Sequence, residues 1–226
     1  MSQPFFLNNT RKFFVIIFSM SQVVLLPTAF LPNSAYFSLL LNEGNVNIDV
    51  YEHFVKQTIR NRCTIVSSNG PLILSIPLIN SGNKTLTGHK IISYAENWQL
   101  KHWRAIESAY SNSPYFEFFE EEIKNSFFSK QELLIDYNQQ LIKTIFSILR
   151  KPININFTES YQAESENDFR NEEKIDQRIV HFPSYYQVFQ HSIGFIPNAS
   201  MLDLLFNEGL QSLSYLKLIL SIKSFS

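Results

Sequence analysis

The first half of the chain shows two hydrophobic patterns. In some segments hydrophobic and polar residues alternate, and in others the hydrophobic residues form short runs. Alternation with a period of two is typical of a strand with one buried face, whereas a short apolar run indicates a fully buried strand. These patterns predict strands over residues 23–26 and 46–50, with a helix over residues 35–41 between them. Strand, helix and strand in close succession predict a βαβ-like unit.

Two further apolar runs predict a β-hairpin. Residues 63–66 and 72–77 are rich in β-forming side chains, and Asn69-Gly70 lies between them. Asn and Gly tolerate the positive φ that a tight hairpin turn requires. Residues 80–90 have the composition of a turn, and Ile91-Ile92 is expected to begin another short strand.

After the hairpin region the hydrophobic period changes to that of a helix. Apolar side chains at three- and four-residue spacing predict a helix over residues 98–110. Ser113 and Pro114 then have the residue types of an N-cap and a first helical position, so a second helix is expected to start there.

A third helix is predicted from the spacing of Ser129 and Glu132. This is the spacing of a capping box, in which each side chain bonds the other's free backbone N–H group, and the helix is expected to end at Leu149. Residues 153–157 form a further candidate strand. Residues 159–174 are acidic and poor in apolar side chains, which indicates a solvated loop.

The C-terminal part predicts two more helices. Asn198 or Ser200 is expected to cap an apolar helix over residues 201–207, and Gly209 is placed to stop it in a left-handed conformation. An amphipathic helix over residues 210–222 follows.

Together these elements predict a single α/β domain. Its small mixed sheet with a β-hairpin, in the N-terminal part, packs against a helix-rich C-terminal part. The chain has 226 residues, 45% of them hydrophobic, which is enough to bury a sizeable core.

Charge and cysteine content narrow the function classes. Nineteen Lys and Arg against twenty Asp and Glu leave a net charge of −1, so no global field recruits nucleic acid or an anionic membrane. Cys63 is the single cysteine, which excludes an internal disulfide and favours a reducing compartment. The sequence contains no Gly-rich phosphate loop, hydrolase elbow or metal-ligand motif, so we expect no metal site, and it specifies no cofactor.

The N-terminus allows more than one interpretation. A basic pair followed by an apolar run over residues 13–26 is similar to a secretory signal, but polar residues interrupt the run and no small-x-small cleavage site precedes Pro27. A second Met-Ser-Gln begins at Met20. We expect residues 1–19 to be a dispensable extension or a start codon called too early, with the domain over residues 20–226. A signal peptide and a membrane-associating segment are the alternatives.

A basic group precedes the predicted hairpin. It consists of Lys56, Arg60, Asn61 and Arg62. Two guanidiniums and an amide can hold a phosphate or a carboxylate bidentately, so the basic group is a candidate anion-binding site. The alternative is that these are ordinary exposed charges at a strand edge.

Two histidines are candidates for proton transfer. His53 follows Glu52 at the carboxyl end of a predicted strand, where open α/β sheets bind ligands. A solvated loop histidine is the alternative. His102 shares a helix face with apolar residues and is expected to be at least partly buried. It becomes a ligand-binding candidate only if Glu107 or Lys101 faces the same cavity.

Asp203 and Asn207 are polar residues at i and i+4 in an otherwise apolar helix. A buried carboxylate needs a partner. We therefore expect Asp203 to pair with Lys56, Arg60 or Arg62, in a structural or site-organising role.

Four sequence blocks, in this order and spacing, resemble the WbqC-like protein family over about residues 22–220. The blocks are Leu26–Pro32 leading to Ala35–Phe37 (block 1); Lys56-Gln57 with Arg60–Arg62 (block 2); Trp98 with His102-Trp103, Tyr110 and Ser113–Phe116 (block 3); and Phe195–Gly209 (block 4). The resemblance implies a cytoplasmic protein of bacterial surface-polysaccharide gene clusters, including those for the O-antigen of lipopolysaccharide. It also implies a transferase-like action on an activated amino-sugar or on an acyl or aminoacyl donor.

Two hypotheses follow for the function. In the first, the basic group holds the anionic part of a nucleotide-sugar or acyl-donor type molecule, His53 or His102 transfers a proton, and Asp203 and Asn207 organise the site. In the second, the chain is a non-catalytic accessory or ligand-binding protein of the same pathway. Neither hypothesis involves nucleic acid or stable membrane insertion, and both leave the oligomeric state open.

Overall fold

The computed structural model describes residues 23–43, 45–80, 85–163, 167–179 and 181–221. The expectations for residues 1–19 lie outside these residues, as does part of the predicted turn at 80–90. Within the described residues, no helix is both long and apolar enough to cross a membrane.

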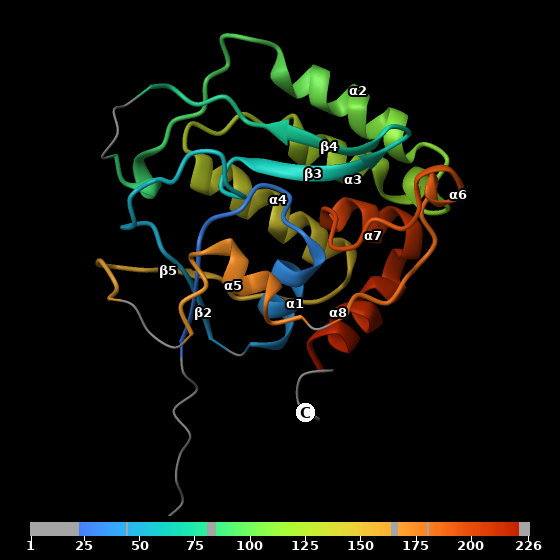
Figure 1. The fold of residues 1–226 in the computed structure, drawn as a ribbon. Coiled ribbons are helices and arrows are strands. Elements are labelled where there is room, and N and C mark those ends of the chain that lie inside the picture. The colour runs from blue at the N-terminus through green and yellow to red at the C-terminus, as the bar shows by residue number, and fades with distance from the viewer. Residues whose placement is uncertain (1–22, 44, 81–84, 164–166, 180, 222–226) are drawn as a thin grey trace, which may run out of the picture.

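The predicted βαβ unit is present. Strand β1 (Val24–Leu26) leads into helix α1 (Ser34–Asn42) and then into strand β2 (Val46–Ile48), which lies parallel to β1. Strand β5 (Asn156–Phe157), from the helical half of the chain, pairs in parallel with the other side of β2 (Figure 1). The order β1-β2-β5 places the carboxyl ends of all three strands at one edge of the sheet.

The predicted hairpin is also confirmed, as a separate two-stranded sheet. Strands β3 (Arg62–Ser67) and β4 (Gly70–Ser75) pair antiparallel, with Ser67 opposite Gly70. The positive φ of the connection, +101°, is at Gly70, so the turn residues are Ser68 and Asn69. The turn is shifted by one residue from Asn69-Gly70, because glycine takes the left-handed conformation more readily than asparagine.

Short segments connect the hairpin to the helices. A single 3₁₀ turn, η1 (Thr87–His89), follows the hairpin, and Ile91 and Ile92 form isolated bridges rather than a regular strand. Helix α2 (Trp98–Tyr110) agrees with the predicted range. Helix α3 (Phe116–Phe127) begins three residues later than Ser113, whose hydroxyl is buried and caps no helix.

The capping box at Ser129 and Glu132 is wrong. Helix α4 (Leu134–Ile148) starts after both residues, and the Ser129 hydroxyl donates to the carbonyl of Ser126 at the end of α3. The Glu132 carbonyl accepts from the backbone N–H of Ile92 at 2.9 Å. Pairing with the segment around Ile92 therefore keeps residues before Leu134 extended, overriding the local helix signal.

The C-terminal part contains short helices and two longer ones: α5 (Glu172–Asp176), α6 (Gln190–Ile193), α7 (Met201–Glu208), the 3₁₀ turn η2 (Gly209–Gln211) and α8 (Ser212–Ser221). Ser200 is the cap of α7, because its hydroxyl accepts from the backbone N–H of Leu202. Gly209 ends the helix with φ +56°, as predicted.

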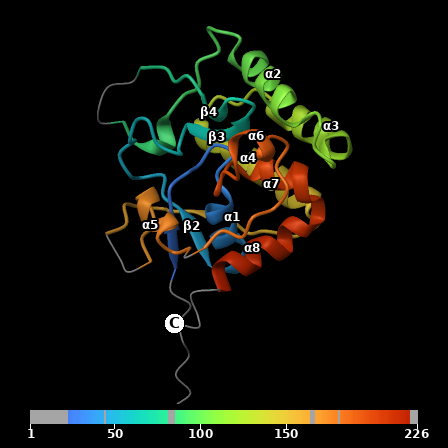
Figure 2. The same ribbon diagram turned by 45° about the vertical axis from the view of Figure 1, so that its right-hand side comes forward.

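One aromatic-rich core joins the two halves of the chain. Its largest fully buried side chains include Trp103, Tyr36, Tyr110 and Tyr137. Helix α8 packs on α1, and β3 packs against both α2 and α7 (Figures 1 and 2). The α/β class and the single compact chain are as expected.

Candidate functional site

The carboxyl edge of the parallel sheet carries a buried ionic network. Arg60 places its Nε 2.7 Å from Oε1 of Glu52 and its Nη2 2.6 Å from Oε2. The guanidinium also donates to the Thr58 hydroxyl and to the Arg170 carbonyl. Only 2% of Arg60 is exposed. The N–H groups of Arg60 are therefore bonded to other residues of the fold and are not available to a ligand.

Arg170 holds the second half of this network. It donates to Oδ2 of Asp49 at 2.7 Å and makes two hydrogen bonds to the carboxylate of Asp168. Burial raises the pKa of Asp168, but the hydrogen bonds from Arg170 outweigh burial and lower the pKa overall. The Thr158 hydroxyl donates to Oδ1 of Asp49. No motif in the sequence pointed to these residues; the available signal was that Asp49 and Thr158 each directly follow a strand.

A cleft of about 210 Å³ lies beside this network, and we call it the Arg62 cleft. Its walls are the turn before α1, the loop before β3, the start of β3, the turn before α7, one residue of β4 and the first residue of α5. The lining residues are Pro32, Asn33, Gln57, Thr58, Ile59, Arg62, Cys63, Thr64, Ile73, Glu172, Asn198 and Ser200. Blocks 1, 2 and 4 thus meet at one place, although they are far apart in the sequence.

The N-termini of two helices meet at the Arg62 cleft. Asn33, the cap of α1, forms a backbone bridge with Ser200, the cap of α7. The backbone N–H of Met201 donates to the carbonyl of Pro32 at 2.8 Å. Because the N-terminal end of a helix carries the positive end of its dipole, this side of the cleft favours an anionic group.

Asn198 connects the helices around the cleft. Its Oδ1 accepts from the backbone N–H of Ala35 at 3.0 Å and from the Ser34 hydroxyl at 3.3 Å. Its Nδ2 donates to Oδ1 of Asp176, in α5, at 2.8 Å. One amide thereby ties the start of α1 to the turn before α7 and to α5.

Backbone strain gathers near the cleft. Among the described non-glycine residues, φ is positive at Leu31, Gln57, Asn198 and Arg150. Gln57 and Asn198 line the cleft, and the carbonyl of Leu31 accepts from the hydroxyl of the lining residue Ser200. Such conformations cost about 1–3 kcal/mol each and concentrate at functional sites.

Arg62 supplies the cation of the cleft. Its Nε is buried and has no hydrogen-bond partner, and the side chain as a whole is half-buried. Because Nε is closed to solvent, the part of the guanidinium that is open to an anion in the cleft is its outer nitrogens. Glu172 also lines the cleft, and its Oε2 accepts from the backbone N–H of Ile59 at 3.1 Å. Burial raises the pKa of the Cys63 thiol, which disfavours a thiolate nucleophile.

The other members of the basic group take different places. Lys56 is exposed and does not line the cleft. The Asn61 amide donates to the carbonyl of Ile76 at 2.9 Å and so closes the base of the hairpin. Of the four residues, Arg62 is the one whose side chain the structure leaves available inside the cleft.

Neither candidate histidine lines the described part of the cleft. His53 is exposed. His102 packs edge-on against Trp98, with ring centroids 5.4 Å apart, and burial together with nearby Lys101 lowers its pKa to about 4. The Glu107 carboxylate accepts from the Trp103 indole and pairs with Lys124, and neither partner is His102.

The expected pairing of Asp203 with Lys56, Arg60 or Arg62 is wrong. Its Oδ2 accepts from the Tyr185 hydroxyl at 2.6 Å and from the Gln187 amide at 2.7 Å. These partners are neutral, and burial raises the pKa of Asp203 to about 6. The sequence contained no local signal for them, because both lie in an irregular segment.

Asp203 nevertheless acts indirectly on the Arg62 cleft, through its hydrogen bond to Gln187. Gln187 also exchanges two hydrogen bonds with the backbone of Ile196, each of 2.9 Å. The pair therefore holds the segment that leads into Asn198. Asn207 donates to the backbone carbonyl of Asp203 at 2.8 Å and lies within α7.

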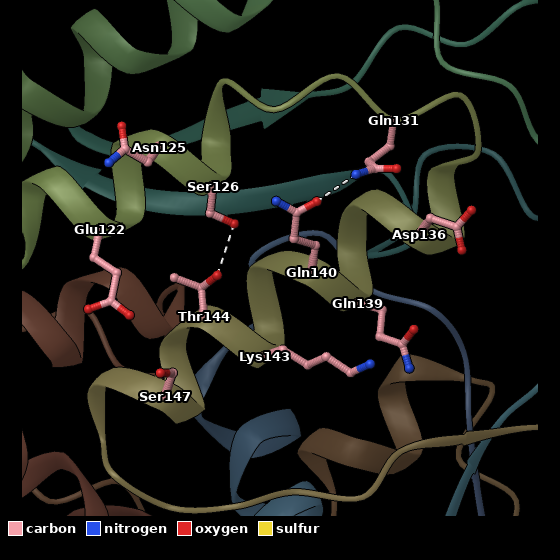
Figure 3. A pocket seen from close by; sticks show the side chains of 10 residues that line it. All are labelled: Glu122, Asn125, Ser126, Gln131, Asp136, Gln139, Gln140, Lys143, Thr144 and Ser147. Carbon is pink, nitrogen blue, oxygen red and sulfur yellow. Dashed lines mark hydrogen bonds between the residues drawn. The ribbon is translucent and has the colours of Figure 1, made fainter.

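A larger groove between α3 and α4 is less suited to ligand binding. It measures about 710 Å³ and is open to solvent. Its polar side chains pair with one another across the groove, Ser126 with Thr144 and Gln131 with Gln140 (Figure 3). Within the described residues, no group of three or more His, Cys, Asp and Glu is placed to hold a metal ion.

Comparison with known proteins agrees with the resemblance seen in the sequence. The model of the WbqC-like protein family matches residues 28–181, a range that ends before block 4. An uncharacterised protein of Mycobacterium tuberculosis, Rv1507c, is 23% identical over 227 residues, covering 88% of this chain and 98% of that protein. No solved structure matches. Because the family model covers more than half of its length, the chain belongs to the WbqC-like protein family.

Proposed function

We propose that this chain is a cytoplasmic, transferase-like protein of bacterial surface-polysaccharide biosynthesis, and that it binds the anionic part of an activated donor in the Arg62 cleft. The donor is an activated amino-sugar or an acyl or aminoacyl compound, as expected for O-antigen assembly. The observation that carries the proposal is the position of Arg62, which lines a cleft where blocks 1, 2 and 4 and the N-termini of α1 and α7 meet.

The residues of the cleft take distinct roles in this proposal. Arg62 donates to the phosphate or carboxylate of the donor, and the N-termini of α1 and α7 add favourable dipoles. Arg60 positions the loop before β3 through Glu52 and does not touch the ligand. Glu172 is the carboxylate that lines the cleft, so proton transfer is assigned to Glu172 rather than to His53 or His102.

The test is a thermal-shift and calorimetric screen of the full chain with UDP-N-acetylglucosamine, acetyl-coenzyme A and inorganic phosphate. Arg62→Ala is compared with Arg104→Ala, which removes an exposed arginine of α2. We expect at least one probe to raise the melting temperature of the parent and of Arg104→Ala but not of Arg62→Ala. Equal shifts in all three proteins would contradict the proposal.

A non-catalytic ligand-binding protein of the same pathway is the second candidate. The observation that favours it concerns Cys63, which lines the cleft. Burial raises the pKa of its thiol, so this residue does not supply a thiolate nucleophile for group transfer. The two candidates differ in turnover. A transferase consumes the bound donor when an acceptor is added, and Glu172→Gln slows that consumption without abolishing binding; a binding protein leaves the donor intact.

A further inference from the structure

One face of the parallel sheet carries an unusual set of side chains. Leu25 pairs in register with Asn47, and Asn47 with Asn156, so the three side chains share one face. The alternate residue Ile48 faces the other way, toward Tyr36 of α1 and Ile135 of α4. Parallel sheets are normally covered by helices on both faces. Here a cleft lies over the second face.

This sheet-face cleft measures about 820 Å³. Val23 and Leu25 give it an apolar side, and most of its other lining residues carry amides or hydroxyls. The polar residues with neutral side chains are Asn47, Asn156, Thr158, Ser160, Gln162 and Asn167. Glu159 is the one lining residue with a charge among those described.

Asparagine at paired positions of two neighbouring strands departs from the usual residue preferences of strands. Asn is depleted in strands, where β-branched residues pack better, yet Asn47 is the central residue of β2 and Asn156 is its partner in β5. Places where a sequence breaks a local rule without a structural gain are expected to be functional. Asn47 is half-buried and Asn156 is exposed, so both amides are open to a ligand in the cleft.

The walls of the cleft are held in place before any ligand arrives. The backbone N–H of Thr158 donates to the carbonyl of Ile48 at 3.0 Å. Arg170, fixed by Asp49 and Asp168, donates to the carbonyl of Gln162 at 3.1 Å. The ionic network at the carboxyl edge of the sheet thus shapes the cleft, and ligand sites are usually preformed in this way.

We propose that the sheet-face cleft binds a neutral ligand with adjacent hydroxyl groups, the chemistry of a sugar ring. Each side-chain amide offers a donor and an acceptor close together, which matches two neighbouring hydroxyls. Asn47 and Asn156 bond the hydroxyls, and the ring rests on Val23 and Leu25. A neutral ligand also avoids the cost of burying an unpaired charge. This site is separate from the Arg62 cleft and does not rest on the function proposed for it.

The test uses isothermal titration calorimetry of the full chain with methyl glucoside, N-acetylglucosamine and myo-inositol as probes. The variants are Asn47→Val and Asn156→Val, with the exposed Asn112→Val as the matched control. We expect at least one probe to bind the parent and Asn112→Val, and to bind each cleft variant roughly tenfold more weakly. Valine suits a strand, so the melting temperatures of the cleft variants should not fall.

Arg62→Ala separates this site from the Arg62 cleft. It is expected to bind the neutral probe as tightly as the parent. The proposal is overturned if none of the probes binds at millimolar concentration, if the valine variants bind as tightly as the parent, or if Arg62→Ala loses the neutral probe.

Discussion

The guanidinium of Arg60 meets the carboxylate of Glu52 in two hydrogen bonds, of 2.7 and 2.6 Å. Both side chains are almost fully enclosed. The pair joins the segment after β2 to the loop that leads into Arg62 at the start of β3, so it fixes the position of one wall of the Arg62 cleft. The sequence predicted both Arg60 and Arg62 as anion ligands; in the structure Arg62 lines the cleft and Arg60 is bound to Glu52.

Removing Arg60 should strongly destabilise the fold. Arg60→Ala leaves the Glu52 carboxylate buried without its partner, which costs about 3–5 kcal/mol of unfolding free energy. Arg62→Ala, which breaks no side-chain hydrogen bond within the described residues, should change the unfolding free energy by less than about 1 kcal/mol. Urea denaturation measures both values. A small loss for Arg60→Ala would mean that water reaches Glu52.

Asp203 should make stability depend on pH. Its pKa of about 6 in the folded chain lies above the ordinary value of 3.8, so between these values the folded state holds the proton more tightly than the unfolded state. Its contribution to stability is therefore greatest below pH 4 and falls as the pH rises to about 6. The full loss is about 3 kcal/mol.

The matched variant for this prediction is Asp203→Asn, which keeps an acceptor for the Tyr185 hydroxyl but does not titrate. Subtracting its unfolding free energy from that of the parent, across pH 4–7, isolates the carboxyl group. The difference should fall with rising pH and then level off. A difference that stays constant over this interval would place the pKa of Asp203 near its ordinary value.

Asn198 should be hard to replace. Asn198→Ala loses the hydrogen bonds to Ala35 and Asp176 and keeps a side chain at φ +53°, so we expect a loss of about 2–3 kcal/mol. Asn198→Gly loses the same bonds but relieves the backbone, so its loss should be smaller by about 1 kcal/mol. Thermal denaturation of the two variants compares them. Equal losses would show that the backbone at this position is unstrained.

Gly209 should tolerate no side chain. A Cβ there would lie 2.8 Å from the ring of Tyr115, and φ is +56°. We expect Gly209→Ala to cost more than about 2 kcal/mol, through both overlap and strain. Gly194→Ala has a positive φ of +79° but open space around the new atom, and it should cost about 1 kcal/mol. Calorimetric melting of the two variants makes the comparison, and similar losses would exclude a contribution from Tyr115.

Elements with strong local signals were predictable from the sequence. The helical period identified α2, and the turn chemistry identified the hairpin and the stop at Gly209. The capping box at Ser129 failed because pairing with Ile92 outweighed the gain from one cap. A cap contributes about 1 kcal/mol, so contacts between distant segments readily override it.

The candidate site likewise depends partly on local sequence and partly on contacts between distant segments. The sequence by itself determined which residues carry charge and which segments form strands and helices, because these properties depend on residue type and on near neighbours. Tertiary structure decided that Arg60 pairs with Glu52, that Asp203 meets Tyr185, and that Arg62 keeps an unpartnered donor in a cleft. The partner of a buried polar group is chosen by packing between segments far apart along the chain, and local pattern does not encode that choice.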